Sequence, residues 1–175
     1  MKLETARLTL RTLTVDDAEA MDTWASNPQN VRWMSWGPNT LEDSLAFLET
    51  VKPDDSNFAV IIEDTGKVIG SAGMFVDAER NEAELGWILH TDHWKQGYGS
   101  EIGAELIRHG FEDLHLRRLY APCAAVNYGS YRVMERNGMR REAHNVKAFW
   151  SRVDEEWIDM YVYAILAEEY VAPGA

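Results

Sequence analysis

The sequence predicts a mixed α/β (α+β) fold in which helices flank a largely antiparallel sheet. Short segments with alternating polar and apolar residues indicate strands, and longer segments with apolar residues three or four apart indicate amphipathic helices. These segments follow one another in the order βααβββαβαββ along the 175 residues. Consecutive strands with short connections favour antiparallel pairing. We therefore expect a single domain over residues 1–175, with about seven strands and about four helices.

The N-terminal part predicts one strand and two helices. The strand is RLTLRTL at 7–13, where polar and apolar residues alternate. The first helix spans 14–28, and Asn27-Pro28 is typical of a helix end. An aromatic loop leads to the second helix at 40–51. The apolar residues of this helix are expected on one buried stripe, which consists of Leu41, Leu45 and Leu48.

The remaining segments predict six strands and two further helices. A Thr65-Gly66 turn joins two strands into a hairpin, and a helix begins at Gly99 after the next strand. Asn127 is a typical N-cap residue for the last helix, and this helix is expected to end at Asn137-Gly138. The strands are expected at 57–64, 67–77, 83–90, 116–126, 139–150 and 156–166, the last two as an antiparallel pair.

Composition excludes several classes of protein. The 17 Lys and Arg residues against 29 Asp and Glu residues give a formal net charge of −12, which argues against a nucleic-acid-binding face and weakly favours cationic partners. One cysteine, Cys123, excludes an internal disulfide and fits a reducing compartment. The sequence shows neither a signal peptide nor a run of the ~20 apolar residues that a membrane span needs. We expect a cytoplasmic protein without a membrane contact.

The stretch HWKQGYGSEIG at 93–103 is the first candidate for a binding site. Gly97 and Gly99 stand at the start of a helix, where unpaired N–H groups and the helix dipole attract anions. Taken alone, the two glycines are explained equally well by a tight turn that packs a helix against a strand. A P-loop is excluded because Lys95 precedes the glycines, and a dinucleotide fingerprint because Ile102 occupies its third glycine position.

The stretch WKQGYG resembles the acetyl-CoA signature of the GNAT superfamily of N-acetyltransferases, Gln/Arg-x-x-Gly-x-Gly/Ala. Trp94 replaces the opening Gln or Arg, which is similar to the branch of ribosomal-protein-alanine (Rim-type) N-acetyltransferases. Five segments resemble blocks of that branch in the same order, and they cover nearly the whole chain: RLTLRTLTVDDAEAM, VRWMSWGPNTLEDSLAFLE, ELGWILHTDHWKQGYGSE, NYGSYRVMERNGMRREA and EWIDMYVYAIL.

The resemblance implies a GNAT fold whose fourth and fifth strands splay apart to hold acetyl-CoA as co-substrate. It implies backbone contacts to the pantetheine arm from Ile88 and Leu89, and a further contact from Asn127. The pyrophosphate loop of the family corresponds here to Lys95, Gln96, Gly97, Tyr98, Gly99 and Ser100. Side-chain identity matters little in such a loop apart from the glycines, because peptide N–H groups are the principal donors.

The chemistry of acetyl transfer needs a base for the ammonium group of the acceptor and an acid for the departing thiolate. By resemblance Glu84 is the base and Ser130 the acid, since Met134 stands where another branch places a tyrosine acid. Two structural alternatives remain: Glu84 as a solvated strand residue, and Ser130 as part of a helix cap. Glu155 and Asp159 are reserve candidates for the base.

The acceptor is expected to be a primary amine, either a protein N-terminus or a small cationic amine. Trp33, Trp36 and Trp150 are candidates for the walls of its pocket, because aromatic faces suit cations, although core packing explains each of them too. No metal is expected, since His90 and His93 lack further ligands at zinc spacing. The family suggests a homodimer. The alternative function is a non-catalytic acyl-CoA-binding sensor or partner module.

Overall fold

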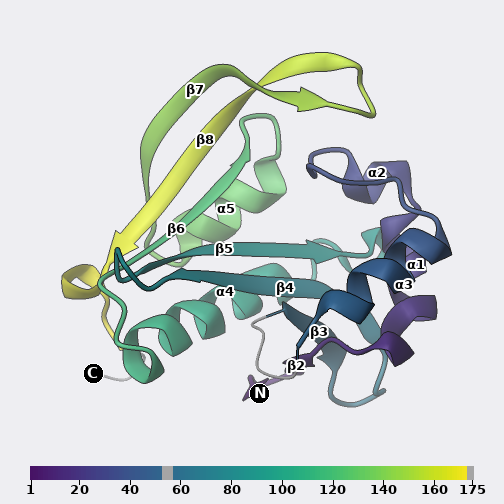
Figure 1. Ribbon diagram of the computed structural model, residues 1–175. Helices are drawn as coiled ribbons and strands as arrows, with labels where there is room; N and C mark the ends of the chain where they lie inside the picture. Colours follow the sequence, from purple (N-terminus) through teal and green to yellow (C-terminus); the bar gives the residue numbers. More distant parts are fainter. Residues whose placement is uncertain (53–56, 173–175) are drawn as a thin grey trace.

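Eight strands form one continuous sheet in the part of the chain that the structure describes. The computed structural model describes residues 1–52 and 57–172. The strands lie in the order β1-β2-β3-β4-β5-β6-β8-β7, and every neighbouring pair is antiparallel except β5 and β6 (Figure 1). In chain order they are β1 (Lys2–Glu4), β2 (Leu8–Thr12), β3 (Asn57–Ile62), β4 (Val68–Asp77), β5 (Glu82–Leu89), β6 (Arg118–Ala124), β7 (Arg140–Ser151) and β8 (Glu156–Leu166). The predicted mixed, mostly antiparallel sheet is confirmed.

The strands are joined by α-helices and by shorter helical turns. Within the described residues the α-helices are α1 (Ala18–Ala25), α2 (Pro28–Val31), α3 (Leu41–Thr50), α4 (Tyr98–Arg108) and α5 (Tyr128–Arg136). The shorter turns are η1 (Val15–Asp17), η2 (Thr91–His93), η3 (His109–Asp113) and η4 (Ala167–Glu169). No helix among these residues is long and apolar enough to cross a membrane.

The helices cover both faces of the sheet. One buried cluster joins α4 and α5 to the sheet, and it contains Phe58 and Val60 of β3. A second buried cluster joins α1 to the sheet and contains Ala59, the residue between them. Because successive side chains of a strand point to opposite faces, α4 and α5 lie on one face and α1 on the other. The consecutive buried residues Phe58, Ala59 and Val60 of β3 therefore lie between two helical layers.

Two elements exceed the predicted seven strands and four helices. β1 pairs with β2, but its three residues are too few to show an alternating pattern. The helix expected over 14–28 ends at Ala25, and the Asn27-Pro28 pair begins α2 instead. The Asn27 side chain accepts a hydrogen bond from the N–H of Gln29 (2.9 Å), with Pro28 at the first helical position. The expected helix end is therefore wrong, because the same residues are equally good N-terminal caps.

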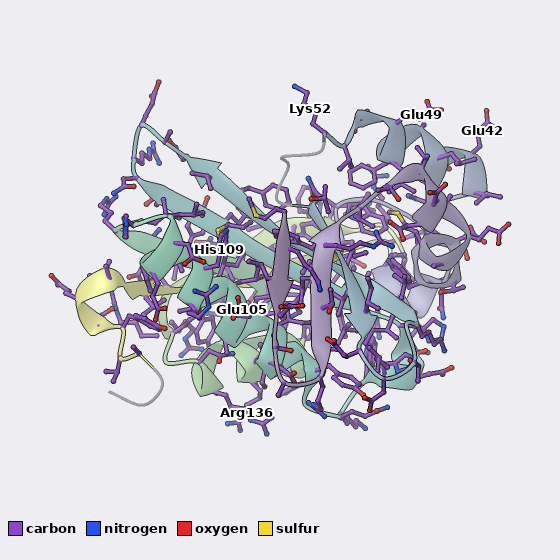
Figure 2. All side chains as sticks on the ribbon, turned by 90° about the horizontal axis from the view of Figure 1, so that it is seen from below. Glu42, Glu49, Lys52, Glu105, His109 and Arg136 are labelled. Atoms are coloured by element: carbon purple, nitrogen blue, oxygen red, sulfur yellow. The ribbon has the colours of Figure 1, made fainter. Side chains whose placement is uncertain are left out.

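The predicted stripe of α3 is also wrong in part. Leu48 is 2% exposed, but Leu41 and Leu45 are 43% and 37% exposed. The buried side of α3 consists of Leu48 and Ser44, and α3 packs on α1 rather than directly across the sheet. Glu42 and Glu49 project from α3 away from the sheet (Figure 2). A helix at the periphery of the fold has fewer neighbours, so it buries fewer of its apolar residues than the sequence pattern alone indicates.

The parallel pair β5 and β6 separates soon after it forms. Only Glu82–Glu84 of β5 pair with Arg118–Tyr120 of β6, although β5 continues to Leu89 and β6 to Ala124. Beyond this point β6 turns away with β8 (Figure 1). Pro122 lies in the separated part of β6 and has no N–H to offer a neighbouring strand. The splay predicted for the fourth and fifth strands is confirmed, and β5 and β6 are those strands.

Candidate active site

The gap between β5 and β6 is bordered by backbone groups that have no strand beside them. The N–H of His90 donates to a carbonyl of β4 (2.8 Å). Since backbone polar groups alternate in direction along a strand, those of Ile88 face β4 as well, whereas those of Trp87 and Leu89 face the gap. The side chain of Ile88 packs in the cluster under α1. This alternation identifies Trp87, which the motif comparison missed, and it was readable from the strand pattern.

The carbonyl of Leu89 is held by two other segments. It accepts hydrogen bonds from the buried Asn30 side chain of α2 (2.6 Å) and from the indole N–H of Trp94 (2.7 Å). Trp94, which replaces the Gln or Arg of the wider signature, thus ties the loop before α4 to the end of β5. The N–H of Leu89, rather than its carbonyl, is the group left for a ligand in the gap.

The loop at 95–100 leads into the N-terminus of α4. Gly97 has φ of +87° and is the N-cap of α4, and Lys95 has φ of +61°. The first intrahelical hydrogen bond runs from the N–H of Glu101 to the carbonyl of Gly97 (3.1 Å). The amide groups of Tyr98, Gly99 and Ser100 precede that bond, so they have no intrahelical acceptor and are donors for an anion.

Arg7 braces this loop from the start of β2. Its guanidinium donates to the carbonyl of Gln96 (3.1 Å), pairs with the carboxylate of Glu101 (2.6 Å) and lies 4.5 Å from the centre of the Tyr98 ring. The pKa of Glu101 is lowered: burial raises it, but hydrogen bonds from Thr5 and Arg7 outweigh the burial. Arg7 was missed because nothing in the sequence relates residues so far apart.

The second glycine of the stretch has a packing role. A Cβ added to Gly99 would lie 3.1 Å from the Val133 side chain of α5, and one added to Gly103 would lie 2.7 Å from Asn137. The Asn137 side chain also donates to the carbonyl of Ser100 (3.1 Å). Gly99 and Gly103, one turn apart, let α5 lie close against α4. Gly99 is therefore explained by helix packing. Gly97 is the glycine with a positive φ, a conformation that other residues rarely adopt.

Glu84 stands at the point where β5 and β6 separate. It is the last residue of β5 that pairs with β6, and it lies opposite Tyr120. Burial, followed by the charge of Glu84, raises the pKa of Tyr120. A Cβ added to Gly86, on the same side of β5, would meet open space. Glu84 forms no ion pair within the described residues, whereas its neighbour Glu82 is buried between Arg117 and Arg118 (3.2 and 3.3 Å).

Asn127 and Ser130 occupy the first turn of α5, next to the end of β6. The Asn127 side chain accepts from the N–H of Ser130 (3.2 Å), so the capping interpretation of this pair is correct. The cap uses the backbone of Ser130 and leaves its hydroxyl without a hydrogen-bond partner in residues 1–52 and 57–172. The helix cap made by Asn127 and the proposed acid role of the Ser130 hydroxyl are therefore compatible.

Asp159, one of the two reserve candidates for the base, is less suitable than Glu84. Asp159 accepts from the N–H of Lys147 (2.8 Å) and lies 2.7 Å from the His144 ring, contacts that lower its pKa and make it a weaker base. Burial raises the pKa of the Cys123 thiol to about 12, which keeps it protonated. The residues that the structure describes contain no cluster of His, Cys, Asp and Glu suited to a metal ion.

The candidate acceptor walls come from two segments that meet. Arg32, just after α2, pairs with Asp154 of the β7–β8 turn (2.8 Å), and Ser151 donates to the carbonyl of Arg32 (3.2 Å). Trp36 packs on the cluster under α1, and the Trp33 ring lies 5.6 Å from the Arg32 guanidinium. Trp150 forms an edge-to-face pair with Trp157 (5.6 Å), which the sequence did not indicate.

The family model of the acetyltransferase (GNAT) domain matches residues 7–140 of this chain. The chain belongs to the GNAT family of acetyltransferases. It is 33% identical to the uncharacterized N-acetyltransferase YnaD of Bacillus subtilis, over 97% of this chain and 99% of the relative. A GNAT acetyltransferase from Bacillus anthracis, whose crystal structure is known, is 32% identical in sequence to this chain. The two structures match with a TM-score of 0.89, over 97% of this chain and 100% of that chain.

A further similar structure is a proposed ribosomal-protein-serine acetyltransferase from Vibrio cholerae. It is 26% identical with a TM-score of 0.75, and the match covers 95% of this chain and 97% of that one. The GNAT family uses acetyl-CoA, and this GNAT domain has the two features that such a molecule needs. These are the donor amides at the start of α4 and the unpaired edge of β5.

Proposed function

We propose that this acetyltransferase transfers an acetyl group from acetyl-CoA to a primary amine, directly, within a ternary complex. The observation that carries the proposal is the separation of β5 and β6 beyond Glu84 and Tyr120, beside the free amides of α4. A gap between two strands admits an extended arm, and a helix N-terminus at its mouth suits a pyrophosphate. Glu84 lies where the arm would end.

The cofactor contacts follow from this placement. The loop at 95–100 receives the pyrophosphate through its amides, with Lys95 as an added positive charge. The edge of β5 at Trp87 and Leu89 receives the amide groups of the pantetheine arm, as an additional strand would. Asn127, at the start of α5, completes the contacts with that arm. Acetyl-CoA supplies the activated acetyl group, and the residues of this chain orient it.

The two proton transfers are assigned to opposite sides of the gap. Glu84 on β5 takes a proton from the ammonium group of the acceptor, directly or through a water molecule. Ser130 on α5 gives its hydroxyl proton to the departing thiolate and regains one from the attacking nitrogen, which carries a surplus proton after the attack. A backbone N–H of β5 that faces the gap stabilises the negative charge that develops on the acetyl oxygen. Each group supports one stage of the same transfer.

The acceptor is a protein N-terminus or a small cationic amine. The similarity to a proposed ribosomal-protein-serine acetyltransferase supports the first class. The net charge of −12 supports a cationic acceptor of either class, because it attracts positive molecules. Trp33, Trp36 and Trp150 are the proposed walls, and a cytoplasmic location fits the single reduced cysteine.

The test is the release of free thiol from acetyl-CoA in the presence of N-terminal peptides and small amines, assayed in parallel. We expect saturable release with at least one acceptor class and acetylation of that acceptor by mass spectrometry. Tight binding of acetyl-CoA without thiol release from any acceptor would instead support the alternative of a non-catalytic acyl-CoA-binding module.

A further inference from the structure

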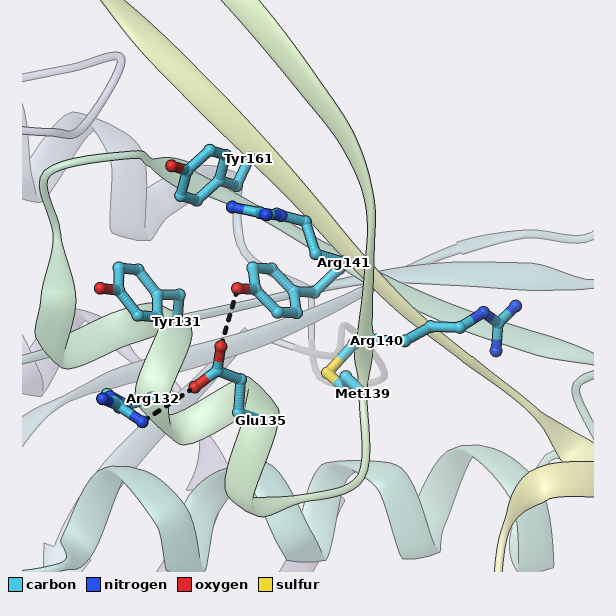
Figure 3. A pocket seen from close by; sticks show the side chains of 8 residues that line it. Tyr131, Arg132, Glu135, Met139, Arg140, Arg141 and Tyr161 are labelled. Atoms are coloured by element: carbon cyan, nitrogen blue, oxygen red, sulfur yellow. Dashed lines mark hydrogen bonds and ion pairs between the residues drawn. The ribbon is translucent and has the colours of Figure 1, made fainter.

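A cavity lies on the far side of α5 from the proposed active site. Its volume is about 410 Å³, and its walls come from α5, from the start of β7 and from β8 (Figure 3). Val133 and Asn137 face α4, whereas Tyr131 and Glu135 face this cavity. No described residue of α4, β5 or the loop at 95–100 lines it. The cavity is therefore separate from the gap that serves acetyl-CoA.

Tyrosine rings form the apolar part of the cavity. Tyr131 and Tyr163 are nearly parallel, 7° apart in plane with centroids 6.3 Å apart, and Tyr161 stands across both at 6.0 and 6.4 Å. The hydroxyl of Tyr163 donates to Glu135 (3.1 Å). The hydroxyls of Tyr131 and Tyr161 have no hydrogen-bond partner in the described part of the chain. Flat faces and two unused hydroxyls suit a ring-shaped polar molecule.

The charged part of the cavity is positive, although the whole protein is strongly negative. Three arginines and one acidic residue line it. Arg132 pairs with Glu135 (3.3 Å), and Arg140 pairs with Glu142 (2.7 Å) and Glu169. Arg141 has no carboxylate partner within the described residues. The tyrosine faces thus border one uncompensated positive charge.

Arg141 is held in a position suited to an anion. Its guanidinium lies 4.5 Å from the centre of the Tyr161 ring, and Figure 3 shows the two side chains next to each other. A guanidinium stacked on an aromatic ring keeps the N–H groups at its edge free for hydrogen bonds. A carboxylate accepts two of these in parallel, which is the strongest arrangement available to the pair.

We propose that this cavity binds a small organic anion in which a carboxylate is attached to an aromatic ring. The carboxylate pairs with Arg141, and the ring lies against Tyr131 and Tyr163, beside the Tyr161 ring that the guanidinium covers. Cavities of roughly 300–1,000 Å³ with a few placed polar groups are typical of small-molecule sites. Inorganic anions would satisfy Arg141 but leave the tyrosine faces bare, so we expect them to bind more weakly.

The test is a titration of the full-length protein with 4-hydroxybenzoate, followed by NMR or calorimetry. We expect saturable binding with a dissociation constant of about 1 mM or below. Acetate and inorganic phosphate, titrated separately, should bind roughly tenfold more weakly, because they carry no ring. Absence of saturable 4-hydroxybenzoate binding overturns the proposal. Equal affinity for phosphate overturns the aromatic carboxylate as the ligand class.

Three variants locate the ligand. Arg141→Gln should weaken 4-hydroxybenzoate binding at least about tenfold, and Arg141→Lys should weaken it less, since the charge remains but the fork is lost. Arg136→Gln is the matched control, because this substitution removes the same charge. Arg136 is exposed, as Arg141 is, and it projects from α5 into solvent (Figure 2). Equal loss in both glutamine variants overturns the proposal, as does a parallel loss of acetyl-CoA affinity in Arg141→Gln.

Discussion

Arg7 and Glu101 lie 94 residues apart in the sequence and side by side in the structure, with Nε of the arginine 2.8 Å from Oε2 of the glutamate. The other carboxylate oxygen of Glu101 accepts from the backbone N–H of Arg7 (2.8 Å) and from the hydroxyl of Thr5 (2.5 Å). The start of β2 is thereby fixed to the first turn of α4. The loop that we assign to the pyrophosphate has a rigid lateral support.

Loss of this support should loosen the loop. For Arg7→Ala we expect the dissociation constant of acetyl-CoA to rise about tenfold, which corresponds to about 1.4 kcal/mol. Calorimetric titration measures it. The matched control is Arg152→Ala, which removes the same charge from the exposed β7–β8 turn. A loss of the same size in the control would mean that general electrostatics, and not the position of Arg7, governs affinity.

Gly97 and Gly103 should respond differently to substitution. Gly97→Val places a side chain at a φ of +87° where the pyrophosphate is expected, so acetyl-CoA affinity should fall at least about tenfold. Gly103→Val forces a clash with Asn137 instead and should lower the free energy of unfolding by about 1–3 kcal/mol. Chemical denaturation and acetyl-CoA titration of both variants separate the two effects. Unchanged affinity in Gly97→Val would remove the pyrophosphate assignment.

Glu84→Gln should lower kcat by about a hundredfold or more while acetyl-CoA affinity stays within about twofold, because a base acts on the proton and not on the cofactor. Glu82→Gln is its control. Glu82 forms ion pairs with three arginines, Arg80, Arg117 and Arg118, and its loss should cost about 1–3 kcal/mol of stability with little effect on kcat. If Glu84→Gln turns over at the rate of the parent protein, another group is the base.

Ser130→Ala should lower kcat by about tenfold or more and leave acetyl-CoA binding nearly intact. The N-cap of α5 survives in this variant, because Asn127 accepts from the backbone N–H at position 130 and not from the hydroxyl. A change in stability is therefore not expected. A fully active variant would assign the acid elsewhere.

Asp17 should make stability depend on pH. Burial raises its pKa, but hydrogen bonds from Arg11 (2.7 and 2.8 Å) and Thr14 outweigh this and hold it below its usual range. The carboxylate therefore stabilises the fold above the unfolded pKa of ~3.9 and loses this effect as the pH falls through the lower folded pKa. Asp17→Asn should cost about 1–3 kcal/mol at pH 7.

The measurement for Asp17 is denaturant unfolding at pH 7, 5 and 3. The difference between the parent protein and Asp17→Asn should shrink towards pH 3. The exposed neighbour Asp16 supplies the control, since Asp16→Asn should change stability by less than about 0.5 kcal/mol at each pH. A constant difference over the whole range would show that packing, and not ionisation, is lost in Asp17→Asn.

Local pattern was sufficient for most elements of this fold. The period of two in RLTLRTL and the period near four in α4 each match a buried face in the structure. The errors occur where one pattern allows two structures. Asn27-Pro28 suits the end of one helix and the start of the next, and the apolar width of α3 depends on what packs against it.

The candidate site divides in the same way. The glycine loop and the helix start at Asn127 were predictable because each depends on backbone geometry within a short stretch. Arg7 was not, since only the folded chain brings it to the loop. Pro122 was an available signal that went unused: a proline inside a predicted strand indicates that one side of that strand has no partner.

The carbonyl of Leu89 links the two halves of the proposed catalytic centre. One of its hydrogen bonds comes from Trp94, in the segment that we propose for the pyrophosphate of the cofactor. The other comes from Asn30 of α2, on the proposed acceptor side. An engineer who remodels α2 to change acceptor preference therefore alters one of the two restraints on an atom that also anchors the cofactor loop. Libraries that vary α2 should keep Asn30 fixed, or should be screened for both substrates together.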